Sequence, residues 1–321
     1  MKLSFKHISI FLLSIGVLAL FGYVATNSGK LPPYIQNLED SAASVFFTES
    51  SNPVTLKNKY DAVAKTGKKV KILIVPGHEP KSGGALYKNL KERDMTVDLA
   101  LKMAELFNKD PHYEVVLTRG KESWNPDFEN YFTTHQSAIE EFIKTKKAEM
   151  NRLVDTGAVT KVADGIEHVN ATPDVARRLY GINKWANENG VDMLIHIHFS
   201  EYPRPKQKSP GKWTGFVLYI PDAQYSNGEV TNSIANYMLF RLASVFPISN
   251  LPKESSGIVK EQDLIAIGSF NTLDSPSVLV EYGYIYDELF ATETKRETTF
   301  NGMAKQTFLG IQDFFAAKIA Q

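Results

Sequence analysis

The chain has 321 residues, enough for one large domain or two small ones. Its 36 basic and 36 acidic side chains balance, whereas a nucleic-acid-binding protein of this size usually carries a basic excess, so nucleic acid is not expected as a partner. The absence of cysteine excludes a disulfide framework, a thiolate metal site and a cysteine nucleophile, and leaves His, Asp and Glu as ligands for any metal.

An apolar segment lies close to the N-terminus. Lys2, Lys6 and His7 precede an apolar run over about 8–25, which is just long enough to cross a bilayer. The basic flank favours a cytoplasmic N-terminus and export of the rest of the chain. We therefore expect residues 1–26 to be a signal anchor, with a cleaved signal peptide as the alternative. Residues 27–69 lack a clear period and are interpreted as a juxtamembrane spacer with room for one short helix.

From residue 70 onward, apolar runs typical of strands alternate with helical patterns. Strands are predicted at 70–75, 113–118, 191–198, 215–220 and 277–281, with 264–268 as a weaker candidate. Helices are predicted at 94–109, 173–188, 223–245 and 292–319, the first of them capped by Asp94. This alternation predicts an α/β fold over residues 70–321, with a mostly parallel twisted sheet flanked by helices.

Polar side chains lie at the carboxyl ends of three of the predicted strands. His78 follows the strand at 70–75, His198 ends the strand at 191–198, and Glu281 ends the strand at 277–281. Ligands of open α/β sheets bind at this end of the strands, so the three side chains are expected to meet at one rim. Imidazoles and carboxylates without thiols suit Zn²⁺ with an open coordination position for water.

Three segments resemble the N-acetylmuramoyl-L-alanine amidases of the Amidase_3 family. Residues 77–107 (GHEPKSGGALYKNLKERDMTVDLALKMAELF) are similar to the family's opening motif, in which a histidine is followed by Gly-Ala and by a Glu before a long helix. Residues 185–200 (WANENGVDMLIHIHFS) resemble the segment with the second histidine, and residues 276–285 (PSVLVEYGYI) resemble the segment with the catalytic Glu. The resemblance extends over about residues 70–320.

The resemblance implies zinc ligands, a reaction and a location. His78, Glu92 and His198 would hold Zn²⁺, and Glu281 would act as general base in hydrolysing the amide bond between N-acetylmuramic acid and L-alanine of peptidoglycan, outside the cytoplasm. His196 is the alternative second histidine ligand, although a place beneath the metal suits it better. Two other functions stay open: a zinc peptidase or carboxypeptidase on the same scaffold, and a non-catalytic cell-wall-binding module.

Two features depart from the family pattern. Glu79-Pro80 stands where the family has two glycines, and residues 120–172 form an insertion that shorter members lack. The insertion contains a predicted amphipathic helix at about 134–157, interpreted either as a surface helix or as a lid whose His135, Glu140 or Glu141 blocks the metal. A lid would call for an activator protein that relieves the block. Arg119, which ends a family-like Leu-Thr-Arg segment, is expected to have a structural role.

Overall fold

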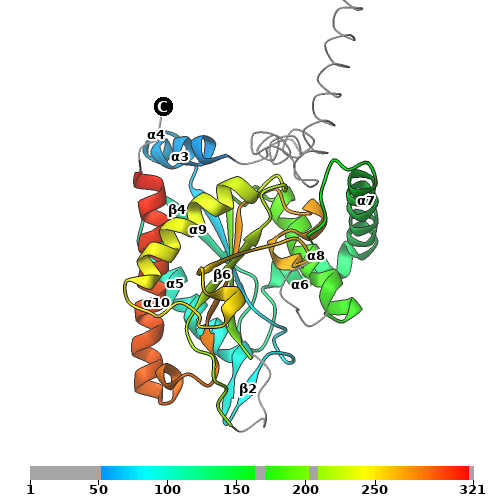
Figure 1. Ribbon diagram of the computed structural model, residues 1–321. Helices are drawn as coiled ribbons and strands as arrows, with labels where there is room; N and C mark the ends of the chain where they lie inside the picture. The colour runs from blue at the N-terminus through cyan, green and yellow to red at the C-terminus, as the bar shows by residue number, and fades with distance from the viewer. Residues whose placement is uncertain (1–51, 163–170, 202–208, 318–321) are drawn as a thin grey trace, which may run out of the picture.

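The computed structural model describes residues 52–162, 171–201 and 209–317. A six-stranded sheet in the order β4-β1-β5-β8-β6-β7 forms its centre (Figure 1). All neighbouring strands are parallel except β6 and β8, so the predicted mostly parallel sheet is confirmed. The strands are β1 (Val70–Pro76), β4 (Tyr113–Leu117), β5 (Met193–Ser200), β6 (Val217–Pro221), β7 (Ile258–Glu261) and β8 (Ser277–Tyr284).

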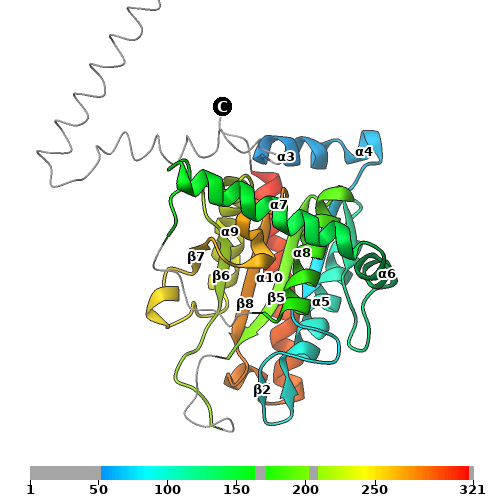
Figure 2. The ribbon, with the colours of Figure 1, turned by 90° about the vertical axis from the view of Figure 1, so that its right-hand side faces the viewer.

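Helices cover both faces of this sheet (Figures 1 and 2). One layer is formed by α5 (Glu92–Asn108), α9 (Gly228–Ala243) and α10 (Glu293–Ala316), and the other by α6 (Pro126–Thr134), α7 (Gln136–Asp155) and α8 (Pro173–Glu188). The central strands are buried on both sides, as their nearly continuous apolar sequences require. Along β1, for example, Ile72 and Ile74 pack toward α5, while Leu73 packs toward α8.

Several short elements lie between the main strands and helices in the chain. They are the hairpin strands β2 (Leu86–Tyr87) and β3 (Leu90–Lys91), the helix α4 (Val63–Thr66), and the 3₁₀ helices η1 (Pro252–Glu254), η2 (Ile265–Ile267), η3 (Ser269–Asn271) and η4 (Glu288–Phe290). The β2–β3 hairpin lies directly before α5, at the carboxyl edge of the sheet (Figure 2).

Three local predictions were wrong. Within 264–268, residues Ile265–Ile267 form the 3₁₀ helix η2 instead of a strand, and Gly268, with a left-handed φ of 98°, caps its carboxyl end. The edge strand β7 was not predicted. Helix α5 begins two residues before Asp94, at Glu92, and its N-cap residue Lys91 makes no side-chain capping bond.

Helix α3 (Pro53–Asp61) belongs to the folded unit, although residues 27–69 were interpreted as a spacer. The Tyr60 ring is stacked between His112 and Phe315, with ring centroids 4.3 and 4.6 Å away. Lys57 donates to the Ala317 carbonyl oxygen (2.7 Å), and Lys59 forms an ion pair with Asp192. These contacts attach α3 to the amino edge of the sheet and to the end of α10.

The expected signal anchor at 1–26 lies outside the described residues. Within the described part of the chain, every helix is too short or too polar to span a bilayer.

Candidate metal centre

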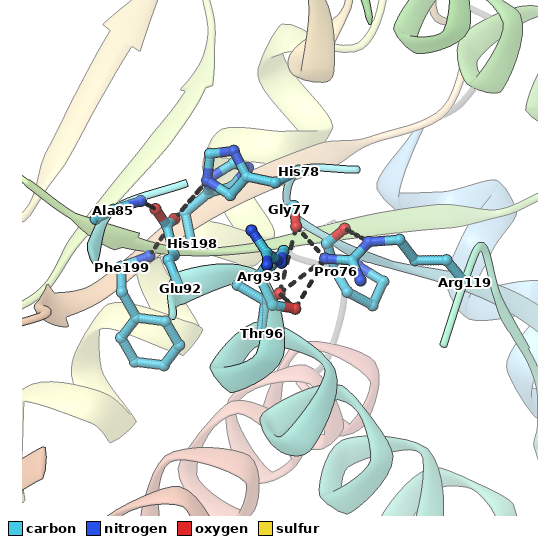
Figure 3. Close-up of polar contacts among 10 residues, drawn as sticks. All are labelled: Pro76, Gly77, His78, Ala85, Glu92, Arg93, Thr96, Arg119, His198 and Phe199. Atoms are coloured by element: carbon cyan, nitrogen blue, oxygen red, sulfur yellow. Dashed lines mark hydrogen bonds and ion pairs between the residues drawn. The ribbon is translucent and has the colours of Figure 1, made fainter. Parts of the chain in front are cut away.

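His78, Glu92 and His198 come together at the carboxyl edge of the sheet (Figure 3). One donor atom from each lies within 4.8 Å of the other two. His78 follows β1, Glu92 opens α5, and His198 lies near the end of β5. Strands β1 and β5 are neighbours in the sheet, so their carboxyl ends lie side by side. The β2–β3 hairpin leads directly into α5 and brings the start of this helix to the same place.

The Glu92 carboxylate is the centre of this group. Its Oε1 atom lies 2.8 Å from His78 Nε2 and 3.2 Å from His198 Nδ1, and it accepts the Phe199 backbone N–H at 2.9 Å. Its Oε2 atom accepts the Ala85 backbone N–H at 2.7 Å. Burial raises the pKa of Glu92, but His78 and His198 lower it by more, so the pKa lies below its ordinary value. Glu92 is thus held as an anion.

Two glycines allow the ligands to approach one another. A Cβ atom on Gly77 would lie 2.4 Å from the His198 ring, and a Cβ on Gly84 would lie 2.9 Å from the His78 ring. Gly84 also has a φ of 79°, which favours glycine. His78 itself has a left-handed φ of 69°, unusual for a non-glycine residue, and such strain is concentrated at functional sites.

The donor set fits a divalent metal with mixed nitrogen and oxygen ligands. His78 Nε2 is buried, and Glu92 Oε1 lies 2.8 Å from it. Burial lowers the pKa of His198, which favours the neutral imidazole that a metal requires. Two imidazoles and one carboxylate are a donor set that zinc enzymes use.

His198, and not His196, supplies the second imidazole. His196 lies two residues earlier on β5, is 1% exposed, and is outside the ligand group. Burial, with a smaller contribution from the charge of His198, lowers its pKa to about 3, so His196 is neutral at physiological pH.

Glu281 lies on β8, directly opposite His198 in the strand register. Its Oε2 atom is buried and makes no hydrogen bond. Burial raises the pKa of Glu281 well above its ordinary value, and the negative charges of Glu92 and Glu254 act in the same direction. The site thus combines one carboxylate held as an anion with a second whose affinity for a proton is raised, and such pairs of carboxyl groups with separated pKa values serve in acid–base catalysis.

A family model for N-acetylmuramoyl-L-alanine amidases matches residues 72–313, which include His78, Glu92, His198 and Glu281. The chain belongs to this amidase family. It is therefore a hydrolase that cleaves the amide bond between N-acetylmuramic acid and L-alanine in peptidoglycan.

Individual relatives are distant. A Buchnera aphidicola protein named as an N-acetylmuramoyl-L-alanine amidase is 22% identical over 250 residues, covering 77% of this chain and 95% of the relative. The amidase AmiB of Haemophilus influenzae is 24% identical over 263 residues, covering 78% of this chain and 53% of AmiB. The CwlD amidase from Clostridioides difficile, solved in complex with the GerS lipoprotein, has 19% identity and a TM-score of 0.49 over 77% of this chain and 99% of that chain.

The amidase's inserted helix α7 lies away from the ligands. It packs against α8 and η3, on the side of the molecule toward α3 and far from the β2–β3 hairpin (Figure 2). His135, Glu140 and Glu141 are exposed and lie outside the ligand group, and Glu140 faces Arg177 at 3.8 Å. In the structure α7 is thus a surface helix, and its candidate blocking side chains lie outside the ligand group.

Two arginines contact the loop that carries His78, and sequence reasoning did not find these contacts. Arg178 on α8 pairs with Glu79 (Nε–Oε1 2.9 Å), the residue that replaces a family glycine. Arg119 donates to the backbone carbonyl oxygens of Pro76, Gly77 and Arg93 (Figure 3). The Leu-Thr-Arg segment predicts a structural role for Arg119, but the hydrogen-bond acceptors of Arg119 depend on tertiary structure.

Proposed function

We propose that the chain hydrolyses peptidoglycan with a Zn²⁺ ion held by His78, Glu92 and His198. The observation that carries this proposal is the convergence of their three donor atoms within 4.8 Å, with Glu92 Oε1 lying 2.8 Å from His78 Nε2 and 3.2 Å from His198 Nδ1. Three protein ligands leave a further coordination position open, as in catalytic zinc sites. When bound, zinc supplies the Lewis acidity that polarises the scissile carbonyl and acidifies water.

Glu281 is the acid–base residue of this proposal. It takes a proton from the attacking water and delivers it to the nitrogen of the departing L-alanine. Its place beside His198 in the register puts it at the ligand group without making it a ligand. Burial raises its pKa, which strengthens it as a proton acceptor and lets the protonated form persist long enough to act as a donor.

The chain is proposed to work outside the cytoplasm, tethered by residues 1–26. Helix α3, the first described helix, lies at the amino edge of the sheet (Figure 1), whereas the elements that carry the ligands place them at the carboxyl edge. A tether that enters through α3 would leave the ligand edge facing away from the membrane. Fractionation of cells that express the full chain, or a variant without residues 1–26, tests this. Recovery of both proteins in the soluble fraction would contradict the tether.

Product analysis tests the catalytic proposal. Peptidoglycan is digested with the full-length chain and Zn²⁺, and the products are identified by mass spectrometry. Stem peptides that begin with a free L-alanine amino group are expected, together with stem-free glycan. Products cut within the stem peptide would favour a peptidase instead. An absence of cleavage by protein that binds zinc at about one ion per chain would contradict the proposed roles.

A further inference from the structure

Arg119 is the largest side chain of the described residues to be almost fully buried. It is 1% exposed, and no carboxylate of the described residues lies within ion-pair distance of its guanidinium group. Burial lowers its pKa to about 10, with Glu79 and Asp94 acting in the opposite direction, so it is charged at neutral pH. Burying a cation is unfavourable unless its donors are satisfied, so the acceptors of Arg119 show what the side chain is for.

Nη1 of Arg119 donates to the neighbouring Gly120 carbonyl oxygen at 2.9 Å, and its other backbone acceptors lie in the two segments that carry the first two ligands. Arg119 Nε donates to the Pro76 carbonyl oxygen at 3.2 Å, and Nη2 donates to the carbonyl oxygens of Gly77 and of Arg93, the latter at 3.0 Å (Figure 3). Pro76 and Gly77 directly precede His78, and Arg93 directly follows Glu92. One planar group thus connects the backbone on one side of His78 with the backbone on one side of Glu92.

The Thr96 hydroxyl makes further contacts between the loop of His78 and the helix of Glu92. It accepts a hydrogen bond from Arg119 Nη2 at 3.2 Å, and its single proton lies within reach of the carbonyl oxygens of Arg93 (3.1 Å) and Gly77 (3.3 Å). Thr96 is one turn into α5 and fully buried, so it connects the helix of Glu92 to the loop of His78.

We propose that Arg119 is a positioning residue that fixes His78 and Glu92 relative to each other and thereby sets the metal affinity of the site. This inference rests on the proposed metal-dependent function. Its physical basis is that His78 holds a left-handed φ and is followed by a loop, so β1 alone does not fix its place. Only a planar fork with several donors can hold these carbonyl groups together, and a lysine ammonium cannot reproduce that geometry.

Metal affinity tests the proposal independently of catalysis. Full-length protein is stripped of metal with a chelator and titrated with Zn²⁺ against a chromophoric competitor. Arg119→Met and Arg119→Lys are expected to weaken zinc binding by about 10–100-fold, the usual effect of removing groups that orient metal ligands. Thr96→Val, which keeps the side-chain shape, is expected to weaken it less. If Arg119→Lys binds zinc as weakly as Arg119→Met, the planar guanidinium geometry of Arg119 is required and its positive charge alone is not sufficient.

A matched control separates positioning from general stability. Arg241 makes a two-bond ion pair with Asp313 between α9 and α10, away from the ligands. Arg241→Met should lower the melting temperature without changing zinc affinity. The proposal is overturned if folded Arg119→Lys and Thr96→Val bind zinc as tightly as the wild type. If Arg119→Met does not fold, the zinc affinities of these two variants test the proposal instead. Absence of zinc binding by the wild type would instead contradict the proposed function itself.

Discussion

The two edges of the central sheet differ in how their polar and aromatic groups are satisfied. At the amino edge, Tyr60 is stacked on both faces, Lys59 has an acidic partner and His112 pairs with Asp110 at 2.7 Å, although the buried Tyr113 hydroxyl makes no hydrogen bond. At the carboxyl edge, His78 has a left-handed φ, and two buried carboxyl groups, those of Glu92 and Glu281, lie beside the histidines, with Glu281 Oε2 making no hydrogen bond.

This difference separates the part of the molecule that stabilises the fold from the part that performs chemistry. Departures from local rules are expected at functional sites, where surrounding structure must compensate for them. Here the compensation is visible, because two backbone N–H groups hold Glu92 and Arg119 holds the loop before His78. Substitutions of the metal-binding group and of Glu281 should therefore change activity, and substitutions at the amino edge should change stability.

The largest expected effect is at Glu281. Glu281→Gln keeps the shape of the side chain but removes its ability to accept and donate a proton. Turnover should fall by about 10²–10⁴-fold, the usual contribution of general acid–base catalysis. Release of stem peptides, followed by mass spectrometry, measures this. Zinc content should be unchanged because Glu281 is outside the ligand group, and a variant that retains wild-type turnover would exclude Glu281 as the acid–base residue.

A substitution at the amino edge should have the opposite profile. Tyr60→Ala removes an aromatic ring stacked between two others, and we expect the free energy of unfolding to fall by about 2 kcal/mol. Tyr60→Phe is the matched control, since it keeps the stacked ring and removes only the hydroxyl, which contacts that of Tyr113, so it should lower the unfolding free energy less than Tyr60→Ala. Urea denaturation measures both. Activity per folded molecule should stay at the wild-type value, and a loss in folded Tyr60→Ala would show that the two edges are coupled.

His196 should make the carboxyl edge sensitive to acid. Its pKa is about 3 in the folded protein and about 6.5 when unfolded, so between these pH values the unfolded state binds the additional proton. The free energy of unfolding is therefore independent of this group above about pH 6.5. As the pH falls from 6.5 towards 3, it decreases with a slope of up to about 1.4 kcal/mol per pH unit. His196→Leu should flatten the dependence of the unfolding free energy on pH in this range. Identical slopes for both proteins would contradict the buried neutral state.

The same contrast explains how much could be predicted from the sequence. The apolar strands and the residues at their ends were predictable, because parallel strands place their carboxyl ends at one edge, and the family-like motif added Glu92. The edge strand β7 was missed because it is short and only partly buried. The stacking of Tyr60 and the acceptors of Arg119 could not be predicted, since each joins segments that only the complete fold brings together.

The smallest effect is expected at α7, where a blocking helix and a surface helix predict different outcomes. His135, Glu140 and Glu141 are exposed, whereas a blocking residue would have to reach the ligand group from the opposite side of α8. Replacing all three by alanine should therefore leave zinc affinity and turnover within about twofold of the wild type, since surface substitutions rarely act over distance. Measuring the rate of stem-peptide release with and without the triple substitution decides between the two. A marked activation would mean that α7 also occupies a second position over the metal, in which these side chains reach it.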